Sequence, residues 1–173
     1  HKKPCKFRFI IAAPKCSIKP LNKAITAIFK LFFHQIEKYN RKSHFYSGIK
    51  SFWVVENNEA VLNSIGKLNK NRRAKCISTF DFSTLYTNIP HNKLIDVLNQ
   101  LIDFCFKDWE DKHIAVTKFG AKWVNDVHKY DLVFSKVKIK DALKYLMNSC
   151  FFTLGNLLFK QVIGIPMGSD PAP

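Results

Sequence analysis

The longest regular pattern in the chain is the spacing of apolar residues within residues 21–39. Six apolar side chains recur there every three or four residues, which is the repeat of one face of an α-helix. They are Leu21, Ile25, Ile28, Phe32, Ile36 and Tyr39. Lys23, Lys30 and Lys38 fall on the other face. We therefore expect an amphipathic core helix. The 47% apolar content of the 173 residues is enough to build a packed core around it.

Three shorter segments also show helical spacing. The first starts at Asn57 or Asn58, either of which can cap a helix, and runs through Leu68. The second covers residues 92–106 and the third covers residues 140–148. Each places apolar side chains on one face, so the sequence predicts further helices that pack against a shared core.

Other segments have the features of β-strands. Residues 6–13 alternate well enough to predict a strand, and residues 51–55 form a short aromatic, extended segment. Residues 151–154 and 157–162 flank the dipeptide Gly155-Asn156, a spacing that favours a tight hairpin. Helices together with strands predict a mixed α/β (α+β) fold class.

The remaining segments carry weaker signals. Residues 40–50 are polar and residues 107–112 are charged, so both are expected to form loops. Residues 114–134 fit neither the helical nor the strand pattern clearly, and no structure is assigned to them.

The charge of the chain points to a polyanionic partner. Its 28 lysines and arginines against 13 acidic residues give a formal net charge of +15. Nucleic acid is the first expectation, and an anionic membrane surface is the alternative. No membrane-spanning run of about 18 apolar residues is present. The most basic run, residues 67–75, predicts nucleic-acid contacts, although such a run is also typical of a solvated loop. The candidate residues are Lys70, Arg72, Arg73 and Lys75.

The cysteines and histidines do not indicate a metal site or a disulfide framework. The five cysteines are scattered and form no Cys-x-x-Cys pair, and the six histidines lack zinc-site spacing. We interpret the cysteines as reduced thiols, mostly packing residues, and expect an intracellular location.

The stretch of residues 79–90 is the first candidate for chemistry. Its β-branched and aromatic residues predict a strand that carries Asp81 and then breaks at Ser, Thr, Asn and Pro. A carboxylate at the end of a strand can hold a metal ion. The alternative is that Asp81 caps its own turn.

A glycine-containing turn is the second candidate. Residues 161–169 contain Gly164 and Gly168, which let the backbone approach a ligand closely, followed by the start of a helix that favours anions. Such turns are also common structural punctuation. Arg8, on the more polar face of the first strand, is the third candidate.

These segments together resemble the reverse transcriptases of Penelope-like retroelements, whose polymerase core is similar to that of telomerase. The resemblance spans nearly the whole chain. The matching blocks are Arg8-Phe9-Ile10, Cys16-Ser17-Ile18-Lys19-Pro20-Leu21, Ser51-Phe52-Trp53-Val54-Val55, Phe80-Asp81-Phe82-Ser83-Thr84-Leu85-Tyr86-Thr87-Asn88-Ile89-Pro90-His91 and Gly164-Ile165-Pro166-Met167-Gly168.

The resemblance implies a right-hand polymerase. Residues 1–75 would be the N-terminal part of the fingers, and residues 76–173 a partial palm with inserted fingers helices and a hairpin. It further implies an RNA template, a DNA primer and deoxynucleoside triphosphates as partners. Catalysis would use two Mg²⁺ ions, or Mn²⁺ in their place, and hard oxygen ligands suit such ions.

The resemblance also implies roles for individual residues. Asp81 would be catalytic and bind the metal ions, helped by the backbone carbonyl of Phe82. Arg8 would grip the triphosphate, for which a guanidinium fork is suited. Tyr86 would lie under the sugar as a gate against the ribose 2′-hydroxyl, or would be an ordinary core tyrosine. Residues of the glycine-containing turn would lie against the templating base and incoming nucleotide. They are Gln161, Gly164 and Gly168.

One family motif has no counterpart in the sequence. The third palm motif, an aromatic residue followed by two aspartates, would lie beyond Pro173. We therefore expect a fragment, truncated before the third palm motif and inactive alone. The alternative functions are a non-catalytic nucleic-acid-binding module and a protein-interaction domain with incidental charge. The resemblance implies a nuclear location.

Overall fold

The computed structural model describes residues 16–49, 57–70, 76, 78–80 and 85–165. The chain divides into two compact units. The first unit comprises His1–Ile36 with Thr84–Pro173, and the second comprises Glu37–Ser83. The predicted boundary between fingers and palm, after Lys75, stays a prediction. Within the described ranges, no helix has the length and apolar character needed to cross a membrane.

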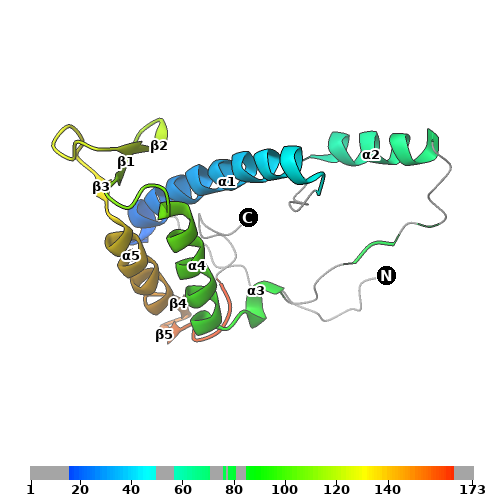
Figure 1. The fold of residues 1–173 in the computed structure, drawn as a ribbon. Helices are drawn as coiled ribbons and strands as arrows, with labels where there is room; N and C mark the ends of the chain where they lie inside the picture. The colour runs from blue at the N-terminus through cyan, green and yellow to red at the C-terminus, as the bar shows by residue number, and fades with distance from the viewer. Residues whose placement is uncertain (1–15, 50–56, 71–75, 77, 81–84, 166–173) are drawn as a thin grey trace, which may run out of the picture. The chain divides into compact units, whose positions relative to one another are not determined.

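Helix α1, Lys19–Ser47, confirms the predicted core helix (Figure 1). Ile25, Ile28 and Phe32 are fully buried, and Leu21 and Ile36 pack against the core from partly buried positions. Tyr39 is 56% exposed, so its assignment to the core was wrong. Tyr39 continues the apolar spacing, but Ile36 is the last residue of α1 that packs against the core of the first unit.

The predicted loop at residues 40–50 was also wrong, because α1 extends to Ser47. Nothing in this segment breaks a helix before Gly48. Arg41 pairs with Glu37 one turn earlier, and the Ser47 hydroxyl donates to the Ser43 carbonyl. Gly48 has a φ of 69°, and its N–H donates to the His44 carbonyl at 2.9 Å. The helix therefore ends at a glycine in the left-handed conformation.

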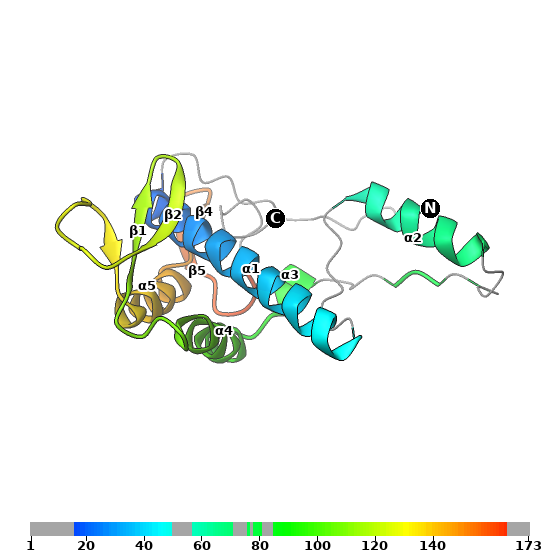
Figure 2. The same cartoon turned by 45° about the horizontal axis from the view of Figure 1, so that its top comes forward.

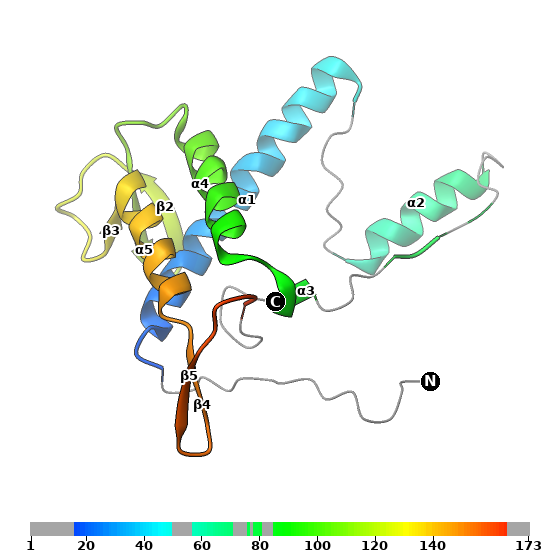
Figure 3. The ribbon, with the colours of Figure 1, turned by 90° about the horizontal axis from the view of Figure 1, so that it is seen from below.

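Two further helices complete the helical part of the core in the first unit. Helix α4, His91–Phe106, buries Ile102, Cys105 and Phe106, and α5, Lys136–Asn148, buries Ile139, Leu143 and Leu146. Figure 3 shows α4 and α5 side by side next to the N-terminal part of α1. The predicted helix at residues 140–148 is thus confirmed but begins four residues earlier, because the Ser135 hydroxyl accepts from the Lys138 N–H.

Residues 114–134, which the sequence left unassigned, form most of a three-stranded antiparallel sheet. The strands are β1, His113–Thr117, β2, Gly120–Val124, and β3, Val133–Phe134, in the order β2-β1-β3. Ile114 lies opposite Trp123 on one side and Phe134 on the other, so all three share a face. Trp123 contacts Phe32 of α1 and Phe106 of α4, with ring centroids 6.2 and 4.8 Å apart. This face of the sheet therefore closes the core (Figure 2).

The predicted hairpin is confirmed as β4, Phe151–Leu154, and β5, Leu157–Lys160, although β5 ends two residues before its predicted end at residue 162. Leu154 pairs with Leu157 across Gly155, which has a φ of 60°. The hairpin is apolar yet exposed, with Phe152 and Phe159 stacked across its strands. In the described residues the chain therefore combines helices with small antiparallel sheets, as the mixed α+β class predicts.

The second unit contains helix α2, Asn58–Lys70. This confirms the predicted helix, but α2 extends two residues past its predicted end at Leu68, into the basic run of residues 67–75. Ser78, Thr79 and Phe80 have no regular secondary structure, and Phe80 is 95% exposed. The predicted strand is therefore wrong for Thr79 and Phe80, since no described strand pairs with them.

The described cysteines agree with the prediction of free thiols that mostly pack. Cys105 and Cys150 are buried, Cys16 is partly buried and Cys76 is exposed, all four without a disulfide. Burial raises the pKa of the Cys105 thiol to about 11. Burial also raises the pKa of Cys150. These two thiols act as packing groups.

Candidate functional site

Four of the predicted site residues fall in the described part of the chain: Lys70, Tyr86, Gln161 and Gly164. The remaining predicted site residues lie outside it and stay predictions. They are Arg8, Arg72, Arg73, Lys75, Asp81, Phe82 and Gly168.

The described ends of the two motif blocks meet in the first unit. The short helix α3, Leu85–Asn88, lies within the Asp81 block, and its Tyr86 carbonyl accepts from the Ile165 N–H at 2.6 Å. The Ile89 carbonyl accepts from the Gly164 N–H at 2.8 Å. Two backbone hydrogen bonds thus join segments that lie more than seventy residues apart in the sequence.

A side chain adds a third connection between these segments. His91, the first residue of α4, contacts the Gly164 carbonyl through Nε2 at 2.6 Å. Because a carbonyl only accepts, the imidazole must carry its proton on Nε2 to make this hydrogen bond. Gly164 is buried and has a φ of 80°, a conformation that side chains with a Cβ rarely adopt. Glycine at this position is what lets the turn approach α3 and α4.

Gln161 lies at the start of the same turn and forms two hydrogen bonds there, while its side-chain oxygen Oε1 accepts none from the described residues. Its backbone N–H donates to the Cys150 carbonyl at 2.8 Å, and its Nε2 donates to the Ile163 carbonyl at 3.0 Å. Its Oε1 is buried and has no hydrogen-bond partner among the described residues. A buried acceptor without a partner costs about 1–3 kcal/mol, so a ligand that donates to this oxygen gains affinity.

The first turn of α4 borders this junction and lacks a side-chain cap. Pro90, at the N-cap, has no side-chain acceptor, and the turn contains no acidic residue. The N–H groups at the start of a helix carry partial positive charge and favour an anion. Tyr86, on α3, is half-buried, which is compatible with either of its predicted roles.

The described residues do not test the predicted metal site. Among them, no three His, Cys, Asp or Glu side chains are grouped as metal ligands would be. Asp81 and Phe82 lie outside these residues, so the Mg²⁺ site stays a prediction. Lys70 is exposed at the end of α2, where a cation also stabilises the helix dipole.

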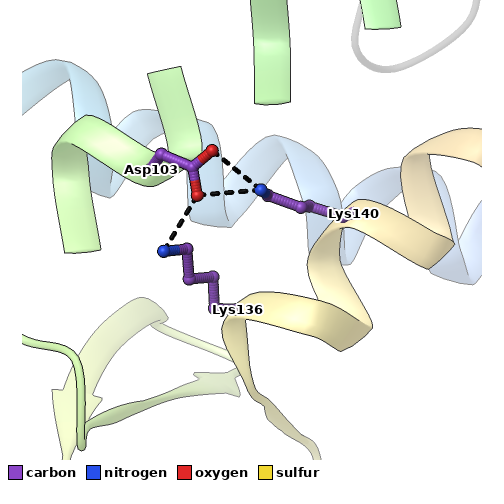
Figure 4. Close-up of polar contacts among 3 residues, drawn as sticks. All are labelled: Asp103, Lys136 and Lys140. Atoms are coloured by element: carbon purple, nitrogen blue, oxygen red, sulfur yellow. Dashed lines mark hydrogen bonds and ion pairs between the residues drawn. The ribbon is translucent and has the colours of Figure 1, made fainter. Parts of the chain in front are cut away.

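Asp103 forms the one recorded carboxylate cluster with two cations in the described chain, and its role is structural. It joins α4 to α5 by accepting from Lys140 Nζ at 2.8 Å and by pairing with Lys136 Nζ at 2.9 Å (Figure 4). Hydrogen bonds from Lys140 and then Lys136 hold the pKa of Asp103 below its ordinary value. Both lysines are bound to Asp103, so we assign the cluster to the link between α4 and α5.

A groove that the sequence did not reveal lies between α1 and the β1–β2 hairpin, within the first unit. We call it the basic groove. Its volume is about 1010 Å³. Its lining includes three lysines, Lys23, Lys30 and Lys118, together with His34, Asp131 and Phe119. The spacing of 7 and 4 residues between Lys23, Lys30 and His34 places them on one helical face, a signal that is present in the sequence.

Comparisons of the chain with protein-family models, with curated proteins and with solved structures give no match.

Proposed function

We propose that this chain is the fingers and partial palm of an RNA-directed DNA polymerase. The observation that carries the proposal is the junction of Tyr86 and Ile89 with Gly164 and Ile165. The two motif blocks that carry the family resemblance most specifically would have to meet if they served one active site. They are far apart in the sequence, and their described ends are hydrogen-bonded to each other.

The proposed reaction is nucleotidyl transfer to a primer. The primer 3′-hydroxyl attacks the α-phosphorus of a deoxynucleoside triphosphate, a new P–O bond forms, and the bond to the β-phosphate breaks to release pyrophosphate. When bound, two Mg²⁺ ions would activate that hydroxyl and stabilise the leaving pyrophosphate. Asp81 and the Phe82 carbonyl would supply the hard oxygen donors that Mg²⁺ prefers.

The described residues would position the nucleotide in this proposal. Gln161 Oε1 is a buried acceptor without a described partner and would receive a hydrogen bond from the incoming nucleotide. The uncapped first turn of α4 would favour the negative phosphates. Tyr86 would lie against the sugar, while Arg8, outside the described residues, would bind the triphosphate.

The test is Mg²⁺-dependent extension of a DNA primer on an RNA template. Because the proposal places two further aspartates C-terminal to Pro173, the protein should be expressed from a gene that continues through them. We expect extension by this protein and none by its Asp81→Asn variant, with primer binding retained. A folded, primer-bound protein that extends nothing would refute the polymerase proposal.

The basic groove favours a second candidate, a non-catalytic module that holds a nucleic-acid strand. Its exposed lysines lie outside the proposed catalytic residues. The module predicts binding that weakens with salt and survives Asp81→Asn, with no primer extension by either protein. Absence of binding at low salt would remove this candidate.

A further inference from the structure

We propose that the basic groove binds a short single strand of RNA through its phosphates and one stacked base. The groove shares no residue with the proposed active site. Binding of a nucleic-acid strand follows from the charges and shape of the groove. The choice of RNA over DNA rests on the proposed function, in which the template is RNA.

The α1 wall supplies two lysines and a histidine in one row. Lys23, Lys30 and His34 are exposed on one face of the helix. At about 1.5 Å per residue they span roughly 16 Å along the helix. The row can therefore follow a strand of a few nucleotides.

These lysines are not neutralised by the rest of the described chain. The ion pairs recorded there use Lys129, Lys136 and Lys140, not Lys23 or Lys30. Asp131 is the one carboxylate in the groove wall, against three lysines. The groove thus keeps a net positive charge, which attracts a polyanion.

The opposite wall presents an aromatic ring at the tip of the β1–β2 hairpin. Phe119 is 89% exposed, and Lys118 Nζ lies 4.9 Å from the centre of its ring. The tip is fixed in place, because Thr117 Oγ1 accepts from the Phe119 N–H at 3.3 Å and donates to the Gly120 carbonyl at 3.2 Å. A single exposed phenylalanine is ordinary on protein surfaces. Beside three lysines that form no ion pair in the described chain, it also matches the arrangement on which single-stranded bases stack.

The size and lining of the groove favour a strand over a small molecule or a duplex. Its volume of about 1010 Å³ is at the upper limit of small-ligand pockets, about 1,000 Å³. Ala27, on the α1 wall, is a small residue that leaves room for a strand between the lysines. In a duplex the base faces are stacked on each other, so Phe119 can stack only on an unpaired base.

The test is fluorescence anisotropy of a labelled oligouridylate of about 12 nucleotides, titrated with the 173-residue protein at several salt concentrations. The groove variant combines Lys23→Gln, Lys30→Gln and Lys118→Gln. The matched control removes the same charge from exposed lysines outside the groove. It combines Lys107→Gln, Lys138→Gln and Lys144→Gln.

We expect the groove variant to lose affinity, and the slope of log K against log salt to fall by about 2, since each phosphate contact contributes about 0.7. The control should keep most of the slope. Phe119→Ala should weaken binding roughly 5- to 150-fold with little change in slope. Equal weakening by the groove and control variants would overturn the proposal. Far-ultraviolet circular dichroism checks that each variant keeps its helical content.

Two further arms test the nature of the ligand. Equal affinity for the matching oligodeoxythymidylate would overturn the assignment to RNA, and equal affinity for a hairpin duplex would overturn the assignment to a single strand. Asp81→Asn should leave oligouridylate binding unchanged. Failed primer extension with intact groove binding therefore counts against the polymerase alone, and lost groove binding with intact extension counts against the groove alone.

Discussion

Replacing Phe32 with alanine removes the side chain on which the core of the first unit converges. Phe32 of α1 is fully buried, and its ring contacts Phe106 of α4 at 6.1 Å and Trp123 of β2 at 6.2 Å between centroids. One residue thus joins two helices and the sheet. Because these rings are close-packed, no neighbouring side chain can fill the space without breaking another of these contacts.

The expected loss is about 3–5 kcal/mol of unfolding free energy, the range for a buried phenylalanine cut to alanine. Natural domains have about 5–15 kcal/mol in total, so the variant should be close to unfolding. With a urea m-value of about 2 kcal/mol per molar, a loss of about 4 kcal/mol lowers the midpoint by about 2 M. The measurement is urea unfolding followed by tryptophan fluorescence, to which Trp123 in the core and Trp109 stacked on it contribute.

Phe119→Ala is the matched control, because it removes the same atoms from an 89% exposed position in the same unit. Its unfolding free energy should match that of the original protein within about 0.5 kcal/mol. A Phe32→Ala midpoint within that same margin would refute the packing of α1 against α4 and the sheet. The two variants should also separate in function, since Phe119→Ala weakens RNA binding without loss of stability.

Two further variants test the junction and the link between α4 and α5. Gly164→Ala forces a side chain into a φ of 80° and should cost about 1–2 kcal/mol in a urea melt, whereas Gly66→Ala, within α2 and with open space around it, should raise the helical signal. Asp103→Asn should cost at most about 1 kcal/mol at neutral pH, because its contact with Lys140 is exposed. The folded pKa of Asp103 is depressed, so its contribution is present above the ordinary value of 3.8 and is lost as the pH falls through the lower folded pKa. The unfolding free energies of the original protein and of Asp103→Asn, measured by urea melts, should therefore converge in acid. A difference that stays constant with pH would contradict the pairing of Asp103 with the two lysines.

The helices were predictable because their apolar residues repeat at a period that only a helix satisfies. The same spacing predicted the ends of α1 and α5 wrongly, because a residue is buried only where the helix packs against another element. Tyr39 continues the spacing of α1 but lies beyond the residues that pack on the core of the first unit. Val137, near the start of α5, is 66% exposed, so the first three residues of the helix bury no apolar side chain. The apolar spacing therefore predicted a start at residue 140, although Ser135 caps the helix, which begins at Lys136.

The three-stranded sheet was not predictable for a different reason. Ile114, Ala115 and Val116 are consecutive apolar residues, so β1 lacks the alternation of a strand with one face in solvent. Ile114 packs against the helices, while Ala115 is buried next to its strand neighbours on the other face. A strand buried on both faces resembles a short helix segment in sequence, and only its pairing distinguishes them.

The junction and the basic groove differ in how far the sequence alone could predict them. The junction joins two blocks whose residue types were already noticeable, and folding adds the hydrogen bonds from Gly164 and Ile165. The basic groove combines residues that are individually unremarkable, two lysines on a helix and a hairpin tip about ninety positions later. Their meeting depends on Trp123 and Phe32, which pack the hairpin strand against α1. Since the same ring contact builds both the core and the groove, Phe32→Ala should weaken oligouridylate binding as well as stability, whereas Phe119→Ala should weaken binding alone.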